Sequence, residues 1–284
     1  MTDPILKWAG GKKSLLREIR GNFPFDYRDR RYHEPFLGGG AVFFWLKPRS
    51  GTVNDVNRRL MNFYRIVRDR PEELIEKARR YRYDEKTYYE LRERFNSGKT
   101  SDVEEAALLL YFNRTAFNGL YRENSKGEFN VPFGDYKNPR IVHEAAIRAA
   151  SNALKKVEVL NLDFDYILDN AKKGDICYFD PPYQPVSETA NFTQYSKNGF
   201  GFEEQELLRD VCVKLHGRGV FFVLSNSYSE EVRTLFENTD GFRIEQVSAK
   251  RSISSDASTR GAIPEILVSN VPQNRMARGK QVTF

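Results

Sequence analysis

The sequence predicts an α/β protein in which a sheet flanked by helices is interrupted by a mostly helical insertion. Short strand-like and helix-like segments alternate over the first 55 residues. Four segments with helical periodicity follow between residues 57 and 115, and the alternation returns after residue 142. This order is typical of a sheet domain with one large insertion. We therefore expect a discontinuous sheet domain (1–55 and 141–272), an insertion (56–140) and a mobile basic tail (273–284).

The first part of the sheet domain contains two helix–strand alternations. We expect a helix over 13–20, a strand over 32–36, a helix over 41–46 and a strand over 51–54. In the insertion, apolar periodicity predicts helices over 57–69, 71–81, 84–96 and 102–115, and Pro71 and Asp102 are typical of helix starts. The segment that follows is rich in Asn, Gly and aromatic residues, and its Ser125-Lys126-Gly127 predicts a β-hairpin turn.

The second part of the sheet domain contains most of the strands. A predicted helix over 142–154 precedes strand-like runs over 157–160, 175–179, 220–224, 242–247 and 266–269, with helices between most of them. The tail after Pro272 carries Arg275, Arg278 and Lys280 without acidic residues.

Composition narrows the class of protein without identifying it. The net charge is +6 and the pI is about 9.1, which favours a polyanionic partner but does not prove one. Cys177 and Cys212 are expected to be buried free thiols, and no metal site is expected from three histidines without paired Cys/His spacing. The start of the sequence has no apolar signal region and no run approaches membrane length, so we expect a cytoplasmic protein.

Asp180-Pro181-Pro182-Tyr183 directly follows an apolar, strand-like run. Asp180 can accept one N–H of a planar amine, and the carbonyl of Pro181 can accept a second. Tyr183 offers a ring face on which a base can stack. The tetrapeptide therefore indicates a protein that modifies an amino group on a nucleobase, although this geometry alone permits adenine or cytosine, in DNA or RNA.

A glycine-rich segment, Glu34-Pro35-Phe36-Leu37-Gly38-Gly39-Gly40, follows a predicted strand and opens a predicted helix. Its glycines let the backbone approach a small molecule closely. A dinucleotide fingerprint is excluded because Phe43 occupies the position of its third small residue. A P-loop ending at Gly11-Lys12 is excluded by Leu6 and Lys13. The alternative is a glycine turn that serves chain reversal alone.

Three further segments have both a ligand-binding and a structural interpretation. Asp55 closes a predicted strand, where a carboxylate can accept hydrogen bonds from a ribose diol or can cap the next helix. Asp163-Phe164 can bracket an adenine ring by amine contact and stacking, although capping is favoured on pattern alone. Trp8 and Lys12 flank a glycine pair and can pack on a ligand and pair with a carboxylate, but a core tryptophan beside a helix start is the simpler interpretation.

The insertion contains Asn118-Gly119-Leu120-Tyr121-Arg122, followed by Asn124 and Pro132. Arginine can bind guanine O6 and N7 bidentately, and an aromatic side chain such as Phe117 can wedge between base steps. A single arginine in a loop is more often solvated or in contact with a phosphate, so this pattern alone does not establish base reading.

Together these blocks resemble the Dam-type DNA adenine-N6 methyltransferases, in which the cofactor motif precedes a target-recognition insertion and an Asp-Pro-Pro-Tyr motif. The match extends over nearly the whole chain, to about Pro272. It rests on Lys7 to Lys12, Glu34 to Gly40, Asn118 to Arg122, Glu128 to Gly134, Asp180 to Tyr183 and Ser187 to Thr193.

The resemblance implies a Rossmann-like methyltransferase sheet for 1–55 and 141–272 and a target-recognition domain for 56–140. It implies S-adenosylmethionine as methyl donor, without a metal, held by Trp8, Lys12, Phe36, Gly38, Gly40, Asp55, Asp163, Phe164 and Asp180. It also implies duplex DNA as substrate and GATC as the site. The DNA-contacting residues would be Phe117, Asn118, Leu120, Arg122, Asn124 and Pro132, with Arg122 reading the guanine.

The expected reaction needs the adenine to leave the duplex, after which Asp180 and the Pro181 carbonyl accept its two N–H bonds and Asp180 stabilises positive charge developing on N6. Cytosine N4 or RNA adenine would use nearly the same pocket, and a catalytically silent DNA-binding relative would keep the fold. The insertion block favours DNA adenine over these alternatives. Asp135 replaces a residue that is often basic in the family, which places a phosphate contact there in question. Pairing with a restriction endonuclease is compatible with the resemblance, but the sequence does not decide it.

Overall fold

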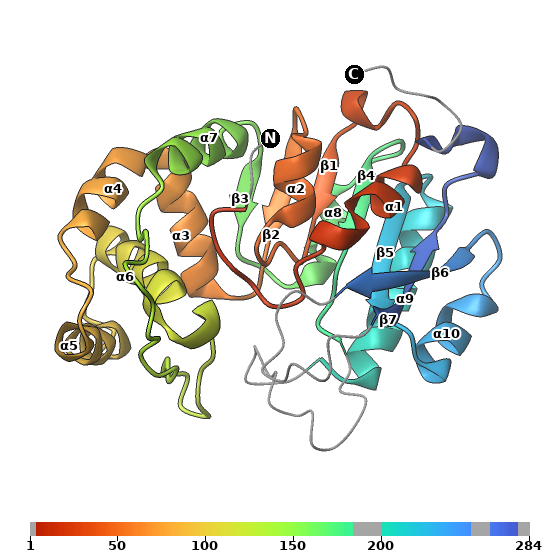
Figure 1. Ribbon diagram of the computed structural model, residues 1–284. Helices are drawn as coiled ribbons and strands as arrows, with labels where there is room; N and C mark the ends of the chain where they lie inside the picture. The colour runs from red at the N-terminus through yellow and green to blue at the C-terminus, as the bar shows by residue number, and fades with distance from the viewer. Residues whose placement is uncertain (1–3, 184–199, 251–261, 278–284) are drawn as a thin grey trace.

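The structure is a computed structural model that describes residues 4–183, 200–250 and 262–277 (Figure 1). Within these ranges, seven strands form one sheet in the order β3-β2-β1-β4-β5-β7-β6. The first five strands in this order, from β3 through β2, β1 and β4 to β5, are parallel. Strand β7 runs antiparallel to both β5 and β6. The predicted α/β sheet with flanking helices is therefore confirmed. The predicted family block from Ser187 to Thr193 lies outside the described residues.

All seven strands lie where the sequence predicts them. They are β1 (Tyr32–Glu34), β2 (Gly51–Asn54), β3 (Glu158–Leu160), β4 (Ile176–Phe179), β5 (Phe221–Ser227), β6 (Arg243–Lys250) and β7 (Ala262–Ser269). The last three are longer than predicted, and in β5 this is because the polar residues Ser225 and Asn226 continue the ladder. Sequence periodicity marks apolar residues and does not detect strand residues whose polar side chains are buried.

The side chains of β4 explain why helices cover both faces of the sheet. Side chains alternate along a strand, so Ile176 and Tyr178 join one core while Cys177 and Phe179 join the other. The first core includes apolar residues of α1 (Leu16–Gly21) and α2 (Ala41–Leu46). The second includes α8 (Ile167–Asn170), α9 (Phe202–Gly217) and α10 (Glu230–Glu237). A strand buried on both faces reads as a continuous apolar run, as this one does.

A group of five helices lies beside the β3 edge of the sheet (Figure 1). It comprises α3 (Arg58–Asp69), α4 (Pro71–Arg79), α5 (Glu85–Asn96), α6 (Asp102–Thr115) and α7 (Glu144–Leu154). The first four confirm the predicted helices, although Ser101 rather than Asp102 caps α6. Nearly every residue of α6 is buried, as expected of a helix surrounded by others.

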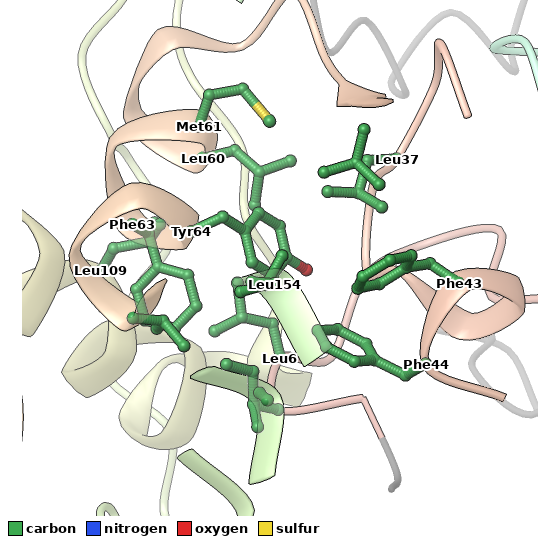
Figure 2. Packing of buried hydrophobic residues seen from close by; sticks show 14 of the residues in the cluster. Leu6, Leu37, Phe43, Phe44, Leu60, Met61, Phe63, Tyr64, Leu109 and Leu154 are labelled. Carbon is green, nitrogen blue, oxygen red and sulfur yellow. The ribbon is translucent and has the colours of Figure 1, made fainter. Parts of the chain in front are cut away.

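This helical group and the sheet share one continuous core. Figure 2 shows Phe43 and Phe44 of α2 facing Leu60 and Tyr64 of α3, and the rings of Phe44 and Tyr64 lie 6.2 Å apart. The packing fixes the position of the insertion relative to the site because side chains in such a core are close-packed. Helix α7, which follows the predicted insertion, is also ion-paired to α4 through Arg148.

The segment between α6 and α7 has the predicted turn and a short β-hairpin around it. The Gly127 N–H donates to the Asn124 carbonyl at 2.8 Å, which closes the turn. Pairing is limited to isolated bridges, such as Glu123 with Phe129. Two backbone bonds flank this bridge, from the Asn124 N–H to the Glu128 carbonyl and from the Asn130 N–H to the Arg122 carbonyl. The side chain of Asn96 bonds the N–H and the carbonyl of Phe129, which lies between them.

The start of the predicted tail is docked rather than mobile. The Phe25 N–H donates to the carbonyl of Arg275, and the Ala277 N–H donates to the carbonyl of Phe23. Met276 and Ala277 are buried. Residues after Ala277 lie outside the described ranges. In the part of the chain that the structure describes, no helix is long and apolar enough to cross a membrane.

Candidate active site

The predicted motifs meet at the carboxyl ends of the central strands. Strand β1 lies between β2 and β4. The next two strands along the chain, β2 and β3, lie on one side of β1, and β4 and β5 lie on the other side. Open parallel sheets bind ligands beside such a reversal of strand order. The glycine-rich segment follows β1, Asp55 follows β2, and Asp180 follows β4. Three motifs that are far apart in the sequence are therefore brought to one edge.

The glycine-rich segment forms a tight turn that requires two of its glycines. Gly38 and Gly40 have φ values of 49° and 69°, in the left-handed region that favours glycine. A Cβ on Gly40 would lie 2.8 Å from Cε2 of Phe44. The Gly38 N–H donates to Oδ2 of Asp55 at 2.9 Å, and the Tyr64 hydroxyl donates to the Gly38 carbonyl at 2.9 Å. The turn is thus fixed to β2 and to α3.

Asp55 is not the cap of α3, because the Asn57 side chain accepts from the Leu60 N–H in that role. The carboxylate of Asp55 instead accepts N–H bonds from Gly38 and from Asn57, each at 2.9 Å. Burial raises the pKa of Asp55 above its ordinary value, and the two N–H donors oppose that rise. Each carboxylate oxygen keeps a second lone pair for a ligand.

Phe36 and Phe164 form a stacked pair, with ring centroids 5.4 Å apart. Phe200 packs edge-on against Phe36 at 5.6 Å. Asp163 is exposed and accepts the Phe164 N–H at 2.7 Å, which is the capping role favoured by the sequence pattern. The Asn54 side chain holds this segment in place, because it bonds both the N–H and the carbonyl of Leu162.

Asp180 lies in a group of charged and hydroxyl side chains. Lys12 Nζ donates to Oδ1 of Asp180 at 2.8 Å, and the two side chains are 4% and 21% exposed. The Ser225 hydroxyl donates to the same oxygen at 3.1 Å. Burial raises the pKa of Asp180, the Lys12 ammonium opposes that rise, and Glu265 adds to it. Lys12 therefore bonds directly to the carboxylate that the sequence predicts to be catalytic.

Tyr183 covers the other side of the Lys12 ammonium. Lys12 Nζ lies 4.5 Å from the centroid of the Tyr183 ring. The Tyr183 hydroxyl donates to Oε2 of Glu265 at 2.7 Å, which fixes the ring against β7. Burial and the negative charges of Asp180 and Glu265 raise the pKa of Tyr183, so its hydroxyl remains protonated. An acceptor and an aromatic face thus surround one cationic group.

Trp8 connects this site to the insertion. Its side chain lies against the glycine turn, since a Cβ on Gly38 would be 3.0 Å from Trp8 Cδ1 and one on Gly39 would be 3.0 Å from Trp8 Cβ. The Trp8 ring also stacks on Tyr121, with centroids 5.3 Å apart. The interpretation of Trp8 as a purely core residue is therefore incomplete.

The predicted DNA-contacting residues divide into exposed and internally bonded groups. Phe117 is 49% exposed, and its N–H donates to the carbonyl of exposed Pro132 at 2.9 Å. Asn118 is exposed at a φ of 54°. Arg122 is exposed and donates through Nε to Oδ1 of Asn130 at 2.8 Å.

Leu120 and Asn124 have contacts within the protein. Leu120 is half-buried and packs against the core. The side-chain Oδ1 of Asn124 accepts N–H bonds from Lys126 and Glu128, and its Nδ2 donates to the Glu128 carboxylate. These bonds fix the turn, so its polar groups are engaged within the loop.

Sequence reasoning missed the residues that hold the site together. Ser225 bonds Asp180, and Glu265 bonds Tyr183, each from a strand distant in sequence. Asn54 and Asn113 bond the backbone of Leu162 and of Lys7, which lie next to predicted site residues. Single polar residues in apolar segments are a weak signal, because buried polar side chains also occur as satisfied core groups.

Fold and site together define a Rossmann-like methyltransferase with an inserted helical group. A family model described as D12 class N6 adenine-specific DNA methyltransferase matches residues 8–253. The chain belongs to this family, and it is therefore a DNA N6-adenine methyltransferase.

Curated relatives match over almost their whole lengths. The chain is 44% identical to Type II methyltransferase M1.LlaDCHI of Lactococcus lactis subsp. cremoris, over 94% of this chain and 95% of the relative. It is 39% identical to Type II methyltransferase M.MjaIII of Methanocaldococcus jannaschii, over 94% and 98%. It is 35% identical to the DNA adenine methylase of Escherichia coli K12, over 94% and 95%. A solved structure described as precorrin 8w decarboxylase, from Methanobacterium thermoautotrophicum, is 14% identical with a TM-score of 0.37 and covers 95% of each chain, a likeness too low to bear on function.

Proposed function

We propose that this protein methylates N6 of an adenine flipped out of duplex DNA, within the sequence GATC, and uses S-adenosylmethionine as methyl donor. The observation that carries the proposal is the group formed by Asp180, Lys12 and Tyr183 at the carboxyl end of β4. A carboxylate that already holds an ammonium against an aromatic face provides the charge environment that a positively charged amine requires.

The residues around the glycine turn fit S-adenosylmethionine. Gly38, Gly39 and Gly40 follow β1 and carry no side chains, so the backbone of this turn can approach a ligand closely. Asp55 is placed to accept hydrogen bonds from ribose hydroxyls, and the Phe36–Phe164 pair offers apolar faces to an adenine. Trp8, Lys12, Gly38, Gly40, Asp163 and Asp180 complete the proposed set. The bound cofactor supplies an electrophilic methyl group.

Asp180 and Pro181 activate the target amine by accepting its two N–H bonds. Adenine N6 is a poor nucleophile because its lone pair is delocalised into the ring. Two acceptors outside the ring plane favour a tetrahedral nitrogen with a localised lone pair, and the Asp180 carboxylate stabilises the positive charge that develops there. Ser225 keeps the carboxylate oriented, and Tyr183 stacks on the base. The adenine N–H would bond the Asp180 carboxylate while the Lys12 ammonium keeps its charge beside it.

The exposed residues of the insertion are proposed to read the DNA. Arg122 would contact guanine O6 and N7, and Phe117, exposed beside Pro132, would enter the base stack. Asn118 would contribute a further contact, while Leu120 and Asn124 support the loop. Residues 56–140 are the proposed target-recognition domain and 1–55 with 141–272 the catalytic domain. Exposed Asp135 provides no attraction for a phosphate.

The biological setting is a further part of the proposal. Two of the relatives named above are called Type II methyltransferases, which motivates a pairing with a restriction endonuclease. Cytoplasmic action follows from a DNA substrate. Methylation of cytosine N4 or of RNA remains the second candidate, because the amine-binding groups would be nearly the same.

Expression in a bacterial host that lacks adenine methylation tests the proposed specificity. Its DNA is digested with two endonucleases, one that cuts only methylated GATC and one that cuts only unmethylated GATC. We expect cleavage by the first and protection from the second. The opposite pattern would reject GATC as the target, and mass spectrometry of the nucleosides would identify N4-methylcytosine if the amine assignment is wrong.

A further inference from the structure

A buried asparagine at the end of α6 joins the insertion to the segment that leads to the active site. Asn113 is 4% exposed. Its Oδ1 accepts the Lys7 N–H at 2.8 Å, and its Nδ2 donates to the Lys7 carbonyl at 2.7 Å. The same Nδ2 reaches the carbonyl of Gly119 at 3.4 Å. One side chain therefore connects the N-terminal segment with the turn that contains the proposed DNA contacts.

This hydrogen-bond pattern makes the junction rigid. Both backbone groups of Lys7 bond a single amide, as they would bond a neighbouring strand, and a buried amide left unpaired is costly. Because Asn113 lies on a buried helix, its own position is fixed by packing. Asn113 therefore holds Lys7 and Gly119 in one fixed arrangement.

Three other contacts join the N-terminal segment to the insertion. Trp8 and Tyr121 stack at 5.3 Å with their planes 23° apart. Lys7 Nζ lies 5.4 Å from the centroid of the Tyr136 ring. A Cβ on Gly119, where φ is 65°, would lie 2.6 Å from Cδ of Lys7, so the two segments are in close contact. The contacts span polar, aromatic and steric interactions, which makes independent movement of the segments unfavourable.

The N-terminal segment then leads directly into the active site. Trp8 lies against Gly38 and Gly39 of the glycine turn. Four residues after Trp8, Lys12 bonds to Asp180. A short series of contacts thus connects the proposed reading turn to both the proposed cofactor site and the catalytic carboxylate.

We infer that Asn113 is a positioning residue that couples recognition of the DNA target to binding of the cofactor. The inference rests on the proposed function, because it assigns DNA to the 117–122 turn and the cofactor to the glycine turn. Coupling between two binding sites is reciprocal, so target DNA must tighten cofactor binding by the same factor as the cofactor tightens DNA binding.

Asn96 offers a matched control for Asn113. It also lies on a helix of the insertion, and its side chain bonds both the N–H and the carbonyl of one residue, Phe129, at 2.8 and 2.9 Å. These bonds remain within the insertion and reach neither Lys7 nor Trp8. Asn96→Asp and Asn113→Asp each keep the acceptor and remove the donor. They differ in what they connect and also in burial, because Asn96 is half-buried and Asn113 is buried.

The test measures the dissociation constant of S-adenosylhomocysteine by calorimetry, with and without a GATC duplex. This product analogue prevents turnover during the titration. We expect wild type to bind it at least about fivefold more tightly with the duplex, in the range usual for coupled sites. Asn113→Asp should reduce that factor to within twofold of one, whereas Asn96→Asp should keep the wild-type factor even if its melting temperature falls.

Several results would overturn the inference. A wild-type factor of one, an unchanged factor in folded Asn113→Asp, or an equal loss in Asn96→Asp would each do so. If Asn113→Asp does not fold, Tyr121→Leu must lose the coupling while Tyr121→Phe keeps it. A wild-type protein that binds neither the duplex nor S-adenosylhomocysteine would instead reject the proposed function itself.

Discussion

Replacement of Lys12 by methionine tests the electrostatics of the site. Methionine keeps much of the length of the side chain but removes the ammonium that bonds Asp180 at 2.8 Å. Loss of one member of a buried ion pair costs about 3–5 kcal/mol. Asp180 is 21% exposed and keeps its Ser225 hydrogen bond, so we expect the smaller loss of about 1–3 kcal/mol in free energy of unfolding.

The same replacement should change the pH dependence of methyl transfer. Burial already raises the pKa of Asp180, and Lys12 opposes that rise. Without the positive charge the neutral acid is favoured further, so the pKa of Asp180 rises. The carboxylate is the form that accepts the amine. As the pH falls, Lys12→Met should therefore lose activity at a higher pH than wild type does. A shift of one pH unit would correspond to about 1.4 kcal/mol.

The measurement is a pH profile of single-turnover methylation at saturating cofactor, combined with urea unfolding. Lys13→Met is the control, because it removes a positive charge from an exposed neighbouring position. We expect the acidic limb to move upward in Lys12→Met and to stay in place in Lys13→Met. An unmoved or downward-shifted limb in folded Lys12→Met would refute the electrostatic role given to this pair.

Three other predictions concern the turn, the core and the insertion. Gly40→Ala should lower the free energy of unfolding by about 2–4 kcal/mol in urea denaturation, because the φ of 69° disfavours a side chain and the new Cβ would lie 2.8 Å from the Phe44 ring. A loss below about 0.5 kcal/mol would contradict this. Burial would raise the pKa of Asp175, but hydrogen bonds from His33 and from the Lys172 N–H, together with nearby positive charge, outweigh burial and lower it. The stability that this carboxylate provides above its unfolded pKa is therefore lost as pH falls through its folded pKa. Asp175→Asn should therefore flatten the acid side of the stability profile measured by thermal melting, and an unchanged slope would count against the pair. Arg122→Ala should reduce discrimination at the guanine of GATC by about 1–3 kcal/mol, measured as the ratio of methylation rates on GATC and AATC duplexes, and an unaltered ratio would exclude it as the guanine reader.

Local sequence patterns predicted the sheet and its insertion well. The apolar run of β4 and the glycine turn after β1 each have a local cause, burial on both faces in one case and left-handed backbone in the other. The meeting of Asp55, Gly38 and Asp180 also follows from sequence, because residues after parallel strands gather at one edge. The extent of β5 was underestimated because its later residues are polar.

Contacts between distant segments were not predictable in the same way. The sequence indicated that Lys12 could pair with a carboxylate, but not that this carboxylate is Asp180, because the pairing depends on how the N-terminal segment crosses the sheet edge. The hairpin turn in the insertion was predicted from its local residues, but the two bonds from the Asn96 side chain of α5 to Phe129 were not. Such outcomes depend on three-dimensional packing, which a local pattern does not contain.

The central claim is that Asp180 activates an adenine amine in DNA, and a direct measurement of the methylated nucleoside tests it. Purified wild type and Asp180→Asn are incubated with S-adenosylmethionine and a GATC duplex, and the digested DNA is analysed by mass spectrometry. We expect N6-methyladenine with wild type and none with Asp180→Asn, which should still bind the duplex. N6-methyladenine formed by Asp180→Asn at a near wild-type rate would contradict the account.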